Sequence, residues 1–273
     1  MIKAAVIGHP IAHSLSPTIH GHWFKEYGIA GEYQAFDIAP ADLAMRVQEL
    51  TDAGYSGFNV TVPHKQTVMA LCDTLDDTAR AIGAVNTVVI MNGKREGRNT
   101  DAFGFIANLK QTFPGFDFTH GAALVLGAGG AARAVLYGLL QEGVPEIRLA
   151  NRTRDKAQTL VHEFPRVKII DWRDREAACE GASLLINTTM LGMQGQEALE
   201  MDLSALTDNA VVYDIVYKPL LTPLLQAAKT RNLPVVTGIG MLLHQARPAF
   251  AAWTGTMPAV TLELEKIITE RAR

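Results

Sequence analysis

The sequence has few cysteines, no run of basic residues and no long uninterrupted apolar segment. Cys72 and Cys179 are the two cysteines among 273 residues, and their spacing matches neither a metal site nor a redox motif. We therefore expect both to be small buried side chains. Without a basic cluster, and with a net charge of −3, the chain has no footprint for nucleic acid. Glycines and Arg133 interrupt the most apolar region, 122–140, so no membrane span is expected.

The sequence also lacks an export signal, a repeat and any low-complexity tract. The start, MIKAAVIGHP, has too short an apolar run for a signal peptide and no cleavage pattern. The composition, 48% hydrophobic and 19% charged, is typical of a globular protein, and the length suits two ordinary domains or one large one. We expect a soluble, cytoplasmic protein, either a monomer or a homodimer.

Segments of strand length alternate with helical patterns in the first hundred residues. The expected strands are 2–7, 33–38 and 58–62, and the expected helices are 17–27, 40–53 and the stretch after Pro63. This alternation is typical of a mostly parallel sheet covered by helices. An apolar run at 85–91, the turn signal Asn92-Gly93 and the return stretch 94–100 then predict a β-hairpin at the edge of that sheet.

A second alternating series follows a helix that is expected to begin near Ala102 and to end before Pro114. Its expected strands are 123–126, 147–150, 168–171, 184–187, 211–214 and 235–237. They would complete a doubly wound Rossmann domain, so helices at 241–250 and 261–272 are expected to return to the first domain. The predicted fold class is α/β with two domains, 1–101 plus 241–273 and 102–240.

The segment ALVLGAGGAARAV, 123–135, has the pattern of a dinucleotide-binding turn between a strand and a helix. Gly127 permits the tight turn, Gly129 lets a pyrophosphate approach the backbone, and Ala132 is small enough for helix–strand packing. The N-terminus of the helix offers N–H groups to phosphate oxygens. The pattern favours a dinucleotide site over a tight turn without a ligand.

The end of the next strand favours NADP over NAD. NAD sites usually have Asp or Glu about 20 residues after the first glycine. Here the strand ends in Asn151, Arg152, Thr153 and Arg154, with Lys156 close behind. Such a cluster suits a 2′-phosphate, which arginine can bind through two parallel hydrogen bonds. A solvated helix face is the alternative for Arg154 and Lys156.

Two later strands of the second domain end in further candidate contacts. Ligands of a doubly wound sheet bind beyond the carboxyl ends of its strands. Thr188, Thr189 and Met193 follow one strand, and Val216 and Tyr217 follow the next. We expect these residues to form walls beside the nicotinamide half of the cofactor, and ordinary loop residues are the alternative.

Polar residues also gather at the strand ends of the first domain. Ser14 and Ser16 are two apart, so they face the same side in an extended stretch. Asn59 and Thr61 have the same spacing in the third strand, and Asn86 lies in the first strand of the hairpin. Each has a simpler explanation, such as a helix cap for a serine before proline. Together, these neutral donors and acceptors suit a small polyhydroxylated ligand.

Lys65 is an unusual residue in its position. The stretch FNVTVPHKQ begins as a buried strand, is cut by Pro63 and places Lys65 where a helix over 67–73 is expected to begin. A cation is unfavourable there, because the exposed N–H groups already carry partial positive charge. Lys65 is either an exposed surface lysine or a group that exchanges a proton with a substrate oxygen. In the second case Asp101, at the end of the hairpin, would orient it and share the proton.

Eight motifs, in this order, show that the chain resembles the shikimate dehydrogenase family over essentially its whole length. The motifs are GHPIAHSLSPTIH at 8–20, GFNVTVPHK at 57–65, GAVNT at 83–87, GRNTDAFGF at 97–105, VLGAGGAARA at 125–134, NRT at 151–153, INTT at 186–189 and GIGMLLHQA at 238–246. The resemblance implies NADPH-dependent reduction of 3-dehydroshikimate to shikimate, a step toward chorismate and the aromatic amino acids. It implies a small-molecule substrate and NADP as the cofactor.

The resemblance also implies a role for each matching residue. Lys65 and Asp101 would be the catalytic pair, and Ser14 and Ser16 would hold the substrate carboxylate. Residues implied to bind the hydroxyls or to lie close to the substrate are Asn59, Thr61, Asn86, Gln245 and Tyr217. Residues implied to bind NADP are Gly127, Ala128, Gly129, Gly130, Ala131, Asn151, Arg152, Thr153, Arg154 and Lys156. Residues implied to lie near the nicotinamide are Met193, Val216, Gly238 and Met241.

Three other interpretations are less consistent with the residues. A quinate/shikimate dehydrogenase accepts an additional ring hydroxyl and often uses NAD, which the cationic cluster at 151–154 argues against. A non-catalytic NADP-sensing protein with the same fold would not need both Lys65 and Asp101. A metal enzyme is not expected, because the histidines between residues 9 and 22 match no metal-binding spacing.

Overall fold

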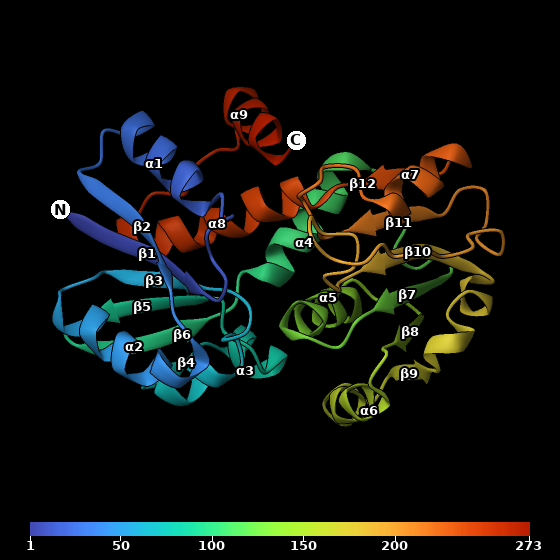
Figure 1. Ribbon diagram of the computed structural model, residues 1–273, viewed down its shortest axis with the longest axis horizontal. Coiled ribbons are helices and arrows are strands. Elements are labelled where there is room, and N and C mark those ends of the chain that lie inside the picture. The colour runs from blue at the N-terminus through green and yellow to red at the C-terminus, as the bar shows by residue number, and fades with distance from the viewer. The chain divides into compact units, whose positions relative to one another are not determined.

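The structure, a computed structural model, describes residues 1–273. The chain forms two compact units, each with its own six-stranded sheet (Figure 1). The first unit contains residues 1–104 and 242–271, and the second contains residues 105–241 and 272–273. This architecture confirms the α/β class that the alternation of strands and helices predicts.

The sheet of the first unit is mixed, with an antiparallel hairpin between parallel pairs. Its strand order is β2-β1-β3-β5-β6-β4. β1 pairs in parallel with β2 and β3, whereas β3–β5 and β5–β6 are antiparallel pairs. The strands are β1 (Ile2–Gly8), β2 (Gly31–Asp37), β3 (Gly57–Val60), β4 (Thr74–Leu75), β5 (Thr87–Met91) and β6 (Lys94–Arg98). The predicted hairpin is formed by β5 and β6.

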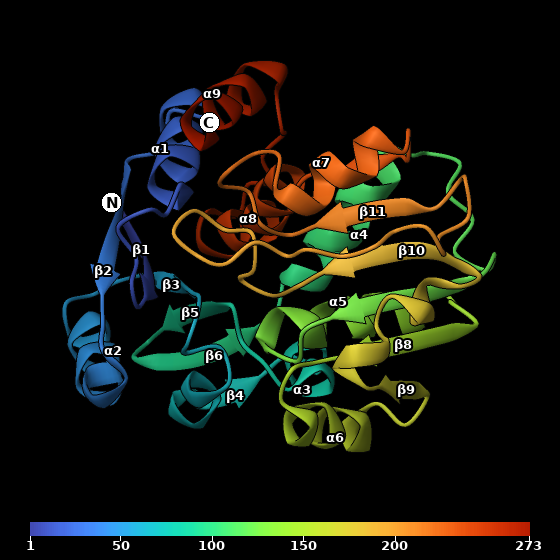
Figure 2. The ribbon, with the colours of Figure 1, turned by 45° about the vertical axis from the view of Figure 1, so that its right-hand side comes forward.

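Helices cover both faces of this sheet, because successive residues of a strand point to opposite sides. Ala5 of β1 packs with the buried face of α2 (Leu43–Asp52), whereas Ala4 packs with Trp253 of α8 (Gly238–Thr254). α8 belongs to the first unit from Leu242 on, and α9 (Leu262–Ala272) follows it. Trp23 of α1 (Ser16–Glu26) donates to the carbonyl of Ala259, and Figure 2 shows α9 (red) beside α1 (blue). The predicted return of the C-terminal helices is confirmed.

The segment after Pro63 differs from the prediction. No α-helix forms over 67–73; turns are followed by a short 3₁₀ helix, Thr67–Leu71. Two β-branched residues begin this stretch, and it is too short for a stable α-helix. The two-residue strand β4 then pairs outside β6, so the hairpin is not the edge of the sheet. α3 (Asp77–Ile82), whose first turn is capped by Asp76, follows β4.

The sheet of the second unit is parallel throughout. Its order is β12-β11-β10-β7-β8-β9, and all six strands predicted from the sequence are present. They are β7 (Ala122–Leu126), β8 (Glu146–Ala150), β9 (Val167–Ile170), β10 (Ala182–Asn187), β11 (Val211–Asp214) and β12 (Val235–Val236). From β7 the chain adds β8 and β9 on one side of the sheet, and it then crosses over to add β10, β11 and β12 on the other side. Doubly wound folds bind their ligands at this switch point, between β7 and β10.

Helices cover both faces of the second sheet as well. On one face, Val125 packs in a core with Leu136 of α5 (Gly130–Gln141) and Leu160 of α6 (Arg154–Glu163). On the other face, Leu124 packs in a core with Leu225 of α7 (Pro223–Thr230). α4 (Asp101–Thr112) begins in the first unit and continues in the second. None of the helices combines the length and the apolar character that a membrane span needs.

Candidate active site

A lysine–aspartate ion pair lies among the polar residues of the first unit. Lys65 Nζ lies 2.5 Å from Asp101 Oδ2, and the two side chains are 15% and 6% exposed. Asp101 is the first residue of α4, where the positive end of the helix favours a carboxylate. Lys65 lies in the turn after β3, and its carbonyl accepts a hydrogen bond from Val85 N–H at 2.7 Å. The start of α4 therefore fixes Asp101, and the hydrogen bond from Val85 fixes the backbone of Lys65.

Asn86 connects this pair to the C-terminal helix α8. Its Nδ2 donates to Asp101 Oδ1 at 2.9 Å, to Thr100 Oγ1 at 2.8 Å and to Gln245 Oε1 at 3.2 Å. Its Oδ1 accepts from the Thr100 N–H at 2.8 Å. Asn86 is 2% exposed, so these bonds are shielded from water. Because Asn86 binds Oδ1 of Asp101, Oδ2 is the oxygen that faces Lys65.

Asn59 continues the network on the neighbouring strand. Asn59 pairs with Thr87 in the antiparallel register of β3 and β5, and its Nδ2 donates to Thr87 Oγ1 at 3.1 Å. The same amide nitrogen donates to the Asn86 carbonyl at 3.2 Å. The Tyr33 hydroxyl donates to Asn59 Oδ1 at 2.6 Å. Four of the predicted residues, Asn59, Asn86, Asp101 and Gln245, thus form one buried polar cluster with Lys65.

Ser14 and Ser16 lie at the start of α1. Ser16 N–H donates to Ser14 Oγ at 3.3 Å, and Ser16 is 6% exposed. The N-cap residue of α1 is Leu15, so Ser16 is not a helix cap, whereas the Ser14 hydroxyl oxygen does accept the first N–H of the helix. The two hydroxyls at the positive end of the helix suit a carboxylate. Thr61 follows β3 and lies close to Gly8, where an added Cβ would be 2.4 Å from Thr61 Cγ2.

The glycine-rich turn of the second unit has space for a bound phosphate. Gly127 has a φ of +106°, and a Cβ there would lie 2.7 Å from Thr188 Oγ1. A Cβ on Gly129, by contrast, would meet no protein atom within 4 Å. α5 begins at Gly130 without a side-chain cap, so its first N–H groups have no capping partner within the chain. Open space above uncapped N–H groups fits the pyrophosphate of a dinucleotide.

A pocket at the ends of β8 and β9 contains the predicted cations. It is lined by Asn151, Arg152, Arg154, Ala157, Ile169, Ile170, Asp171 and Trp172. The guanidinium of Arg152 is 3.5 Å from Glu197, and that of Arg154 is 3.6 Å from Asp171. Both side chains are at least 60% exposed, so these ion pairs are weak and a phosphate can replace them. Lys156 lies exposed on α6 and does not line the pocket.

The loops after β10 and β11 are held by a buried carboxylate. Asp214, which has no exposed surface, accepts hydrogen bonds from Thr222 Oγ1 at 2.6 Å, Val216 N–H at 3.0 Å and Asn187 Nδ2 at 3.0 Å. Burial raises the pKa of Asp214 to about 6, against the effect of these donors. Thr189 donates to Asn187 Oδ1 at 2.7 Å. The residues beside Val216 are therefore fixed by a network that sequence analysis missed.

Three further predicted contacts of the second unit, Thr188, Met241 and Gly238, have structural roles within the chain. Thr188 Oγ1 donates to the carbonyl of Leu126 at 2.6 Å, which ties the end of β10 to that of β7. Met241 is 7% exposed and belongs to the core of the second unit. Gly238 begins α8, and a Cβ there would lie 2.2 Å from the Ile215 carbonyl oxygen. A contact of these residues with a cofactor stays a prediction.

Four residues of the first-unit network were not singled out from the sequence: Tyr33, Thr87, Asn99 and Thr100. Asn99 donates to the Ala84 carbonyl at 2.8 Å and accepts from Asp101 N–H at 3.0 Å. Thr87, Asn99 and Thr100 lie inside the motifs GAVNT and GRNTDAFGF, and that position is their only signal. Tyr33 lies in no motif, and its partner Asn59 is 26 residues away.

Two family models match the chain. The model described as shikimate dehydrogenase substrate binding domain matches residues 6–88, and the model described as shikimate / quinate 5-dehydrogenase matches residues 108–215. Among curated proteins, the shikimate dehydrogenase (NADP(+)) of Paramagnetospirillum magneticum is 51% identical over 267 residues, which cover 97% of each chain. That of Azorhizobium caulinodans is 49% identical over 98% of this chain and 96% of its own.

Solved structures give the same result. Shikimate 5-dehydrogenase from Thermus thermophilus, in complex with NADP(H) and shikimate, has a TM-score of 0.87 and 37% identity, covering 100% of this chain and 98% of its own. Quinate dehydrogenase from Corynebacterium glutamicum, in complex with NAD, has a TM-score of 0.87 and 31% identity, covering 99% and 98%. With relatives about half identical over nearly their full length, the chain belongs to the shikimate dehydrogenase family.

Proposed function

We propose that this chain catalyses the reversible, NADPH-dependent reduction of 3-dehydroshikimate to shikimate in the biosynthesis of chorismate and the aromatic amino acids. The observation that carries this proposal is the shielded Lys65–Asp101 pair, joined to Asn86 and Gln245. It supplies a proton donor and several hydroxyl-binding groups in one cluster. The curated relatives about half identical to this chain carry the same activity in their names.

The first unit would hold the substrate. The hydroxyls of Ser14 and Ser16 would bind the carboxylate at the start of α1. The residues that would bind the ring hydroxyls are Asn59, Thr61, Asn86 and Gln245. This set offers neutral donors and acceptors, which a polyhydroxylated ring needs in place of water. We propose residues 1–101 with 241–273 as this substrate domain and residues 102–240 as the NADP domain.

The second unit would hold NADP. Gly127, Ala128, Gly129, Gly130 and Ala131 would bind the pyrophosphate, since the turn leaves open space above uncapped N–H groups. The residues proposed for the 2′-phosphate are Asn151, Arg152, Thr153, Arg154 and Lys156. No carboxylate among residues 151–154 can receive a ribose 2′-hydroxyl, as an NAD site requires. The nicotinamide half would lie near Thr188, Thr189, Met193, Val216, Gly238 and Met241.

The proton chemistry falls to the lysine–aspartate pair. When bound, NADPH supplies a hydride to the carbonyl carbon of the substrate. Lys65 would donate a proton to the carbonyl oxygen and take one from the alcohol in the reverse direction. Asp101 Oδ2 would hold the amine in place, while Asn86 holds Oδ1 so that the carboxylate cannot rotate away. Such a positioned acid–base group typically contributes about 10²–10⁴ in rate.

Near-ultraviolet absorbance of the reduced nicotinamide tests the proposal. The purified protein is mixed with shikimate and NADP, with shikimate and NAD, and with quinate and each cofactor. Rapid reduction of NADP with shikimate is the expected result. Faster turnover of quinate, or equal use of NAD, would instead assign the chain to the quinate-using branch. No reduction in any mixture would refute the activity.

We further propose a cytoplasmic enzyme, either a monomer or a homodimer.

A further inference from the structure

Tyr33 lies at one end of the polar network in the first unit. Its hydroxyl donates to Asn59 Oδ1 at 2.6 Å. Asn59 Nδ2 donates to Thr87 Oγ1 at 3.1 Å, and Thr87 donates to Asn86 Oδ1 at 3.1 Å. A continuous chain of hydrogen bonds therefore runs from Tyr33 to the lysine–aspartate pair, and Tyr33 is the member of it that no motif contains.

A buried histidine holds the Tyr33 ring. His20 has no exposed surface, and its ring stacks on Tyr33 with centroids 4.1 Å apart and planes 5° apart. Trp23, Phe250 and Trp253 contact the other sides of His20. Burial lowers the pKa of His20 to about 3 and raises the pKa of Tyr33 well above its usual value. Tyr33 is thus a fixed, neutral phenol at physiological pH, with one proton to donate.

Tyr33 determines what Asn59 can offer to a ligand. The Asn86 backbone carbonyl can only accept, so the amide atom of Asn59 that lies 3.2 Å from it must be Nδ2. Both N–H bonds of Asn59 are then used, by Asn86 and by Thr87. Oδ1 takes the Tyr33 proton and keeps one lone pair. Asn59 therefore presents a fixed acceptor, which suits a hydroxyl of the substrate.

We propose that Tyr33 is a positioning residue of the substrate site, which acts through Asn59. The inference rests on the proposed function, in which Asn59 binds the substrate. Without the Tyr33 hydroxyl, Asn59 Oδ1 loses its fixed donor. The glycine-rich turn and the cation pocket that would bind NADP belong to the second unit, outside this network. Removing the Tyr33 hydroxyl should therefore weaken the binding of shikimate and leave the binding of NADP unchanged.

Tyr33→Phe tests this inference by comparing two Michaelis constants. We expect the KM for shikimate to rise about tenfold, the effect of one lost hydrogen bond, while the KM for NADP stays within about twofold. Partial unfolding would lower kcat without changing either KM, so loss of stability cannot imitate this result. Tyr55→Phe is the matched control, because Tyr55 also donates to a side-chain amide, Gln34 Oε1 at 2.9 Å, on the exposed surface. It should change neither KM.

A double-mutant cycle tests whether Tyr33 acts through Asn59. In an Asn59→Ala background, Tyr33→Phe should raise the KM for shikimate by much less than in the wild type, because most of its effect is already lost. Where turnover is too low, the shikimate Kd replaces the KM. An unchanged KM in Tyr33→Phe, in an active wild-type background, would overturn the inference alone. Full additivity in the cycle would overturn the route through Asn59. An inactive wild type would instead refute the proposed function on which the inference rests.

Discussion

At the scale of residues, we propose that Arg152 sets the cofactor preference of the second unit. Arg152 lines the pocket at the end of β8, and its side chain is 63% exposed. Its ion pair with Glu197 is 3.5 Å long and exposed, so it contributes little to stability. The guanidinium is therefore available to a 2′-phosphate, which NADP carries and NAD lacks.

Replacing Arg152 should change the preference between the two cofactors. Arg152→Gln is expected to raise the KM for NADP by about 10- to 100-fold, because a hydrogen bond between charged groups contributes about 1.5–3 kcal/mol. The KM for NAD should stay within about twofold. Initial rates with varied cofactor measure both constants. Arg166→Gln removes another exposed arginine of the second unit and should change neither. Equal changes in the two KM values would contradict the role of Arg152.

Site residues can be predicted best from the sequence when they follow a strand within a known motif. The positions of Lys65, Asp101 and Arg152 at strand ends are examples. Tyr33 and Asp214 could not be predicted, because their importance depends on partners that only the folded chain brings near. Asp214 ends a strand of four buried residues, and it carries no mark that distinguishes it from an exposed loop aspartate. Its partner Asn187 is 27 residues away.

At the scale of elements, the turn between β7 and α5 contains one glycine that the fold requires and one that we propose lies against the ligand. Gly127 needs its positive φ and its close approach to Thr188 to form the turn. Gly129 has an extended backbone with a φ of −94°, which alanine also adopts, and free space where a Cβ would be. The first glycine is therefore required by the fold, and the second by the proposed ligand.

Two alanine substitutions distinguish these roles. Gly127→Ala should lower the free energy of unfolding by about 1–3 kcal/mol, because alanine is strained at this φ. Gly129→Ala should leave the free energy of unfolding within about 0.5 kcal/mol of the wild type, yet weaken NADP binding at least about tenfold. Denaturant unfolding and NADP titration measure the two quantities. Normal NADP binding by Gly129→Ala would contradict the proposed position of the pyrophosphate.

The larger elements could be predicted because their apolar patterns are long. All strands of the second sheet were expected, and so was the return of α8 and α9. The expected α-helix over 67–73 was wrong, since a five-residue apolar stretch does not distinguish α-helix from 3₁₀ helix. The two-residue β4 has no periodicity at all, and it is defined only by its pairing with β6.

At the scale of the whole molecule, stability should fall in acid because a neutral histidine is buried in the first unit. The pKa of His20 is about 3 in the folded chain, below its ordinary value of 6.5. As the pH falls below 6.5, the unfolded chain binds a proton that the folded chain does not. The stability present above that pH is therefore lost progressively toward pH 3.

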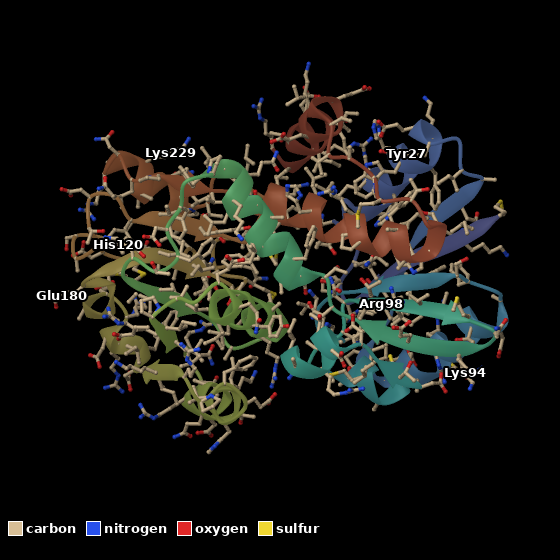
Figure 3. All side chains as sticks on the ribbon, turned by 180° about the vertical axis from the view of Figure 1, so that it is seen from behind. Tyr27, Lys94, Arg98, His120, Glu180 and Lys229 are labelled. Atoms are coloured by element: carbon tan, nitrogen blue, oxygen red, sulfur yellow. The ribbon has the colours of Figure 1, made fainter.

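His20→Phe should remove this contribution. Relative to the wild type, the variant should lose about 2 kcal/mol less free energy of unfolding between about pH 8 and about pH 5. The comparison uses the change of the free energy of unfolding with pH. A packing cost of the larger ring that does not depend on pH therefore cancels. His120→Gln, at an exposed position (Figure 3), is the control and should follow the wild type. Parallel curves for His20→Phe and the wild type, from denaturant unfolding at each pH, would contradict the buried neutral histidine.

The most direct measurement compares shikimate-dependent NADP reduction by the wild type, Lys65→Ala and Lys94→Ala. Lys94 is an exposed lysine at the start of β6, directly after the hairpin turn (Figure 3). We expect Lys94→Ala to match the wild type and Lys65→Ala to lose about 10²–10⁴ in kcat, with NADP binding retained. Turnover by Lys65→Ala at the wild-type rate would contradict the central claim that the Lys65–Asp101 pair exchanges the proton.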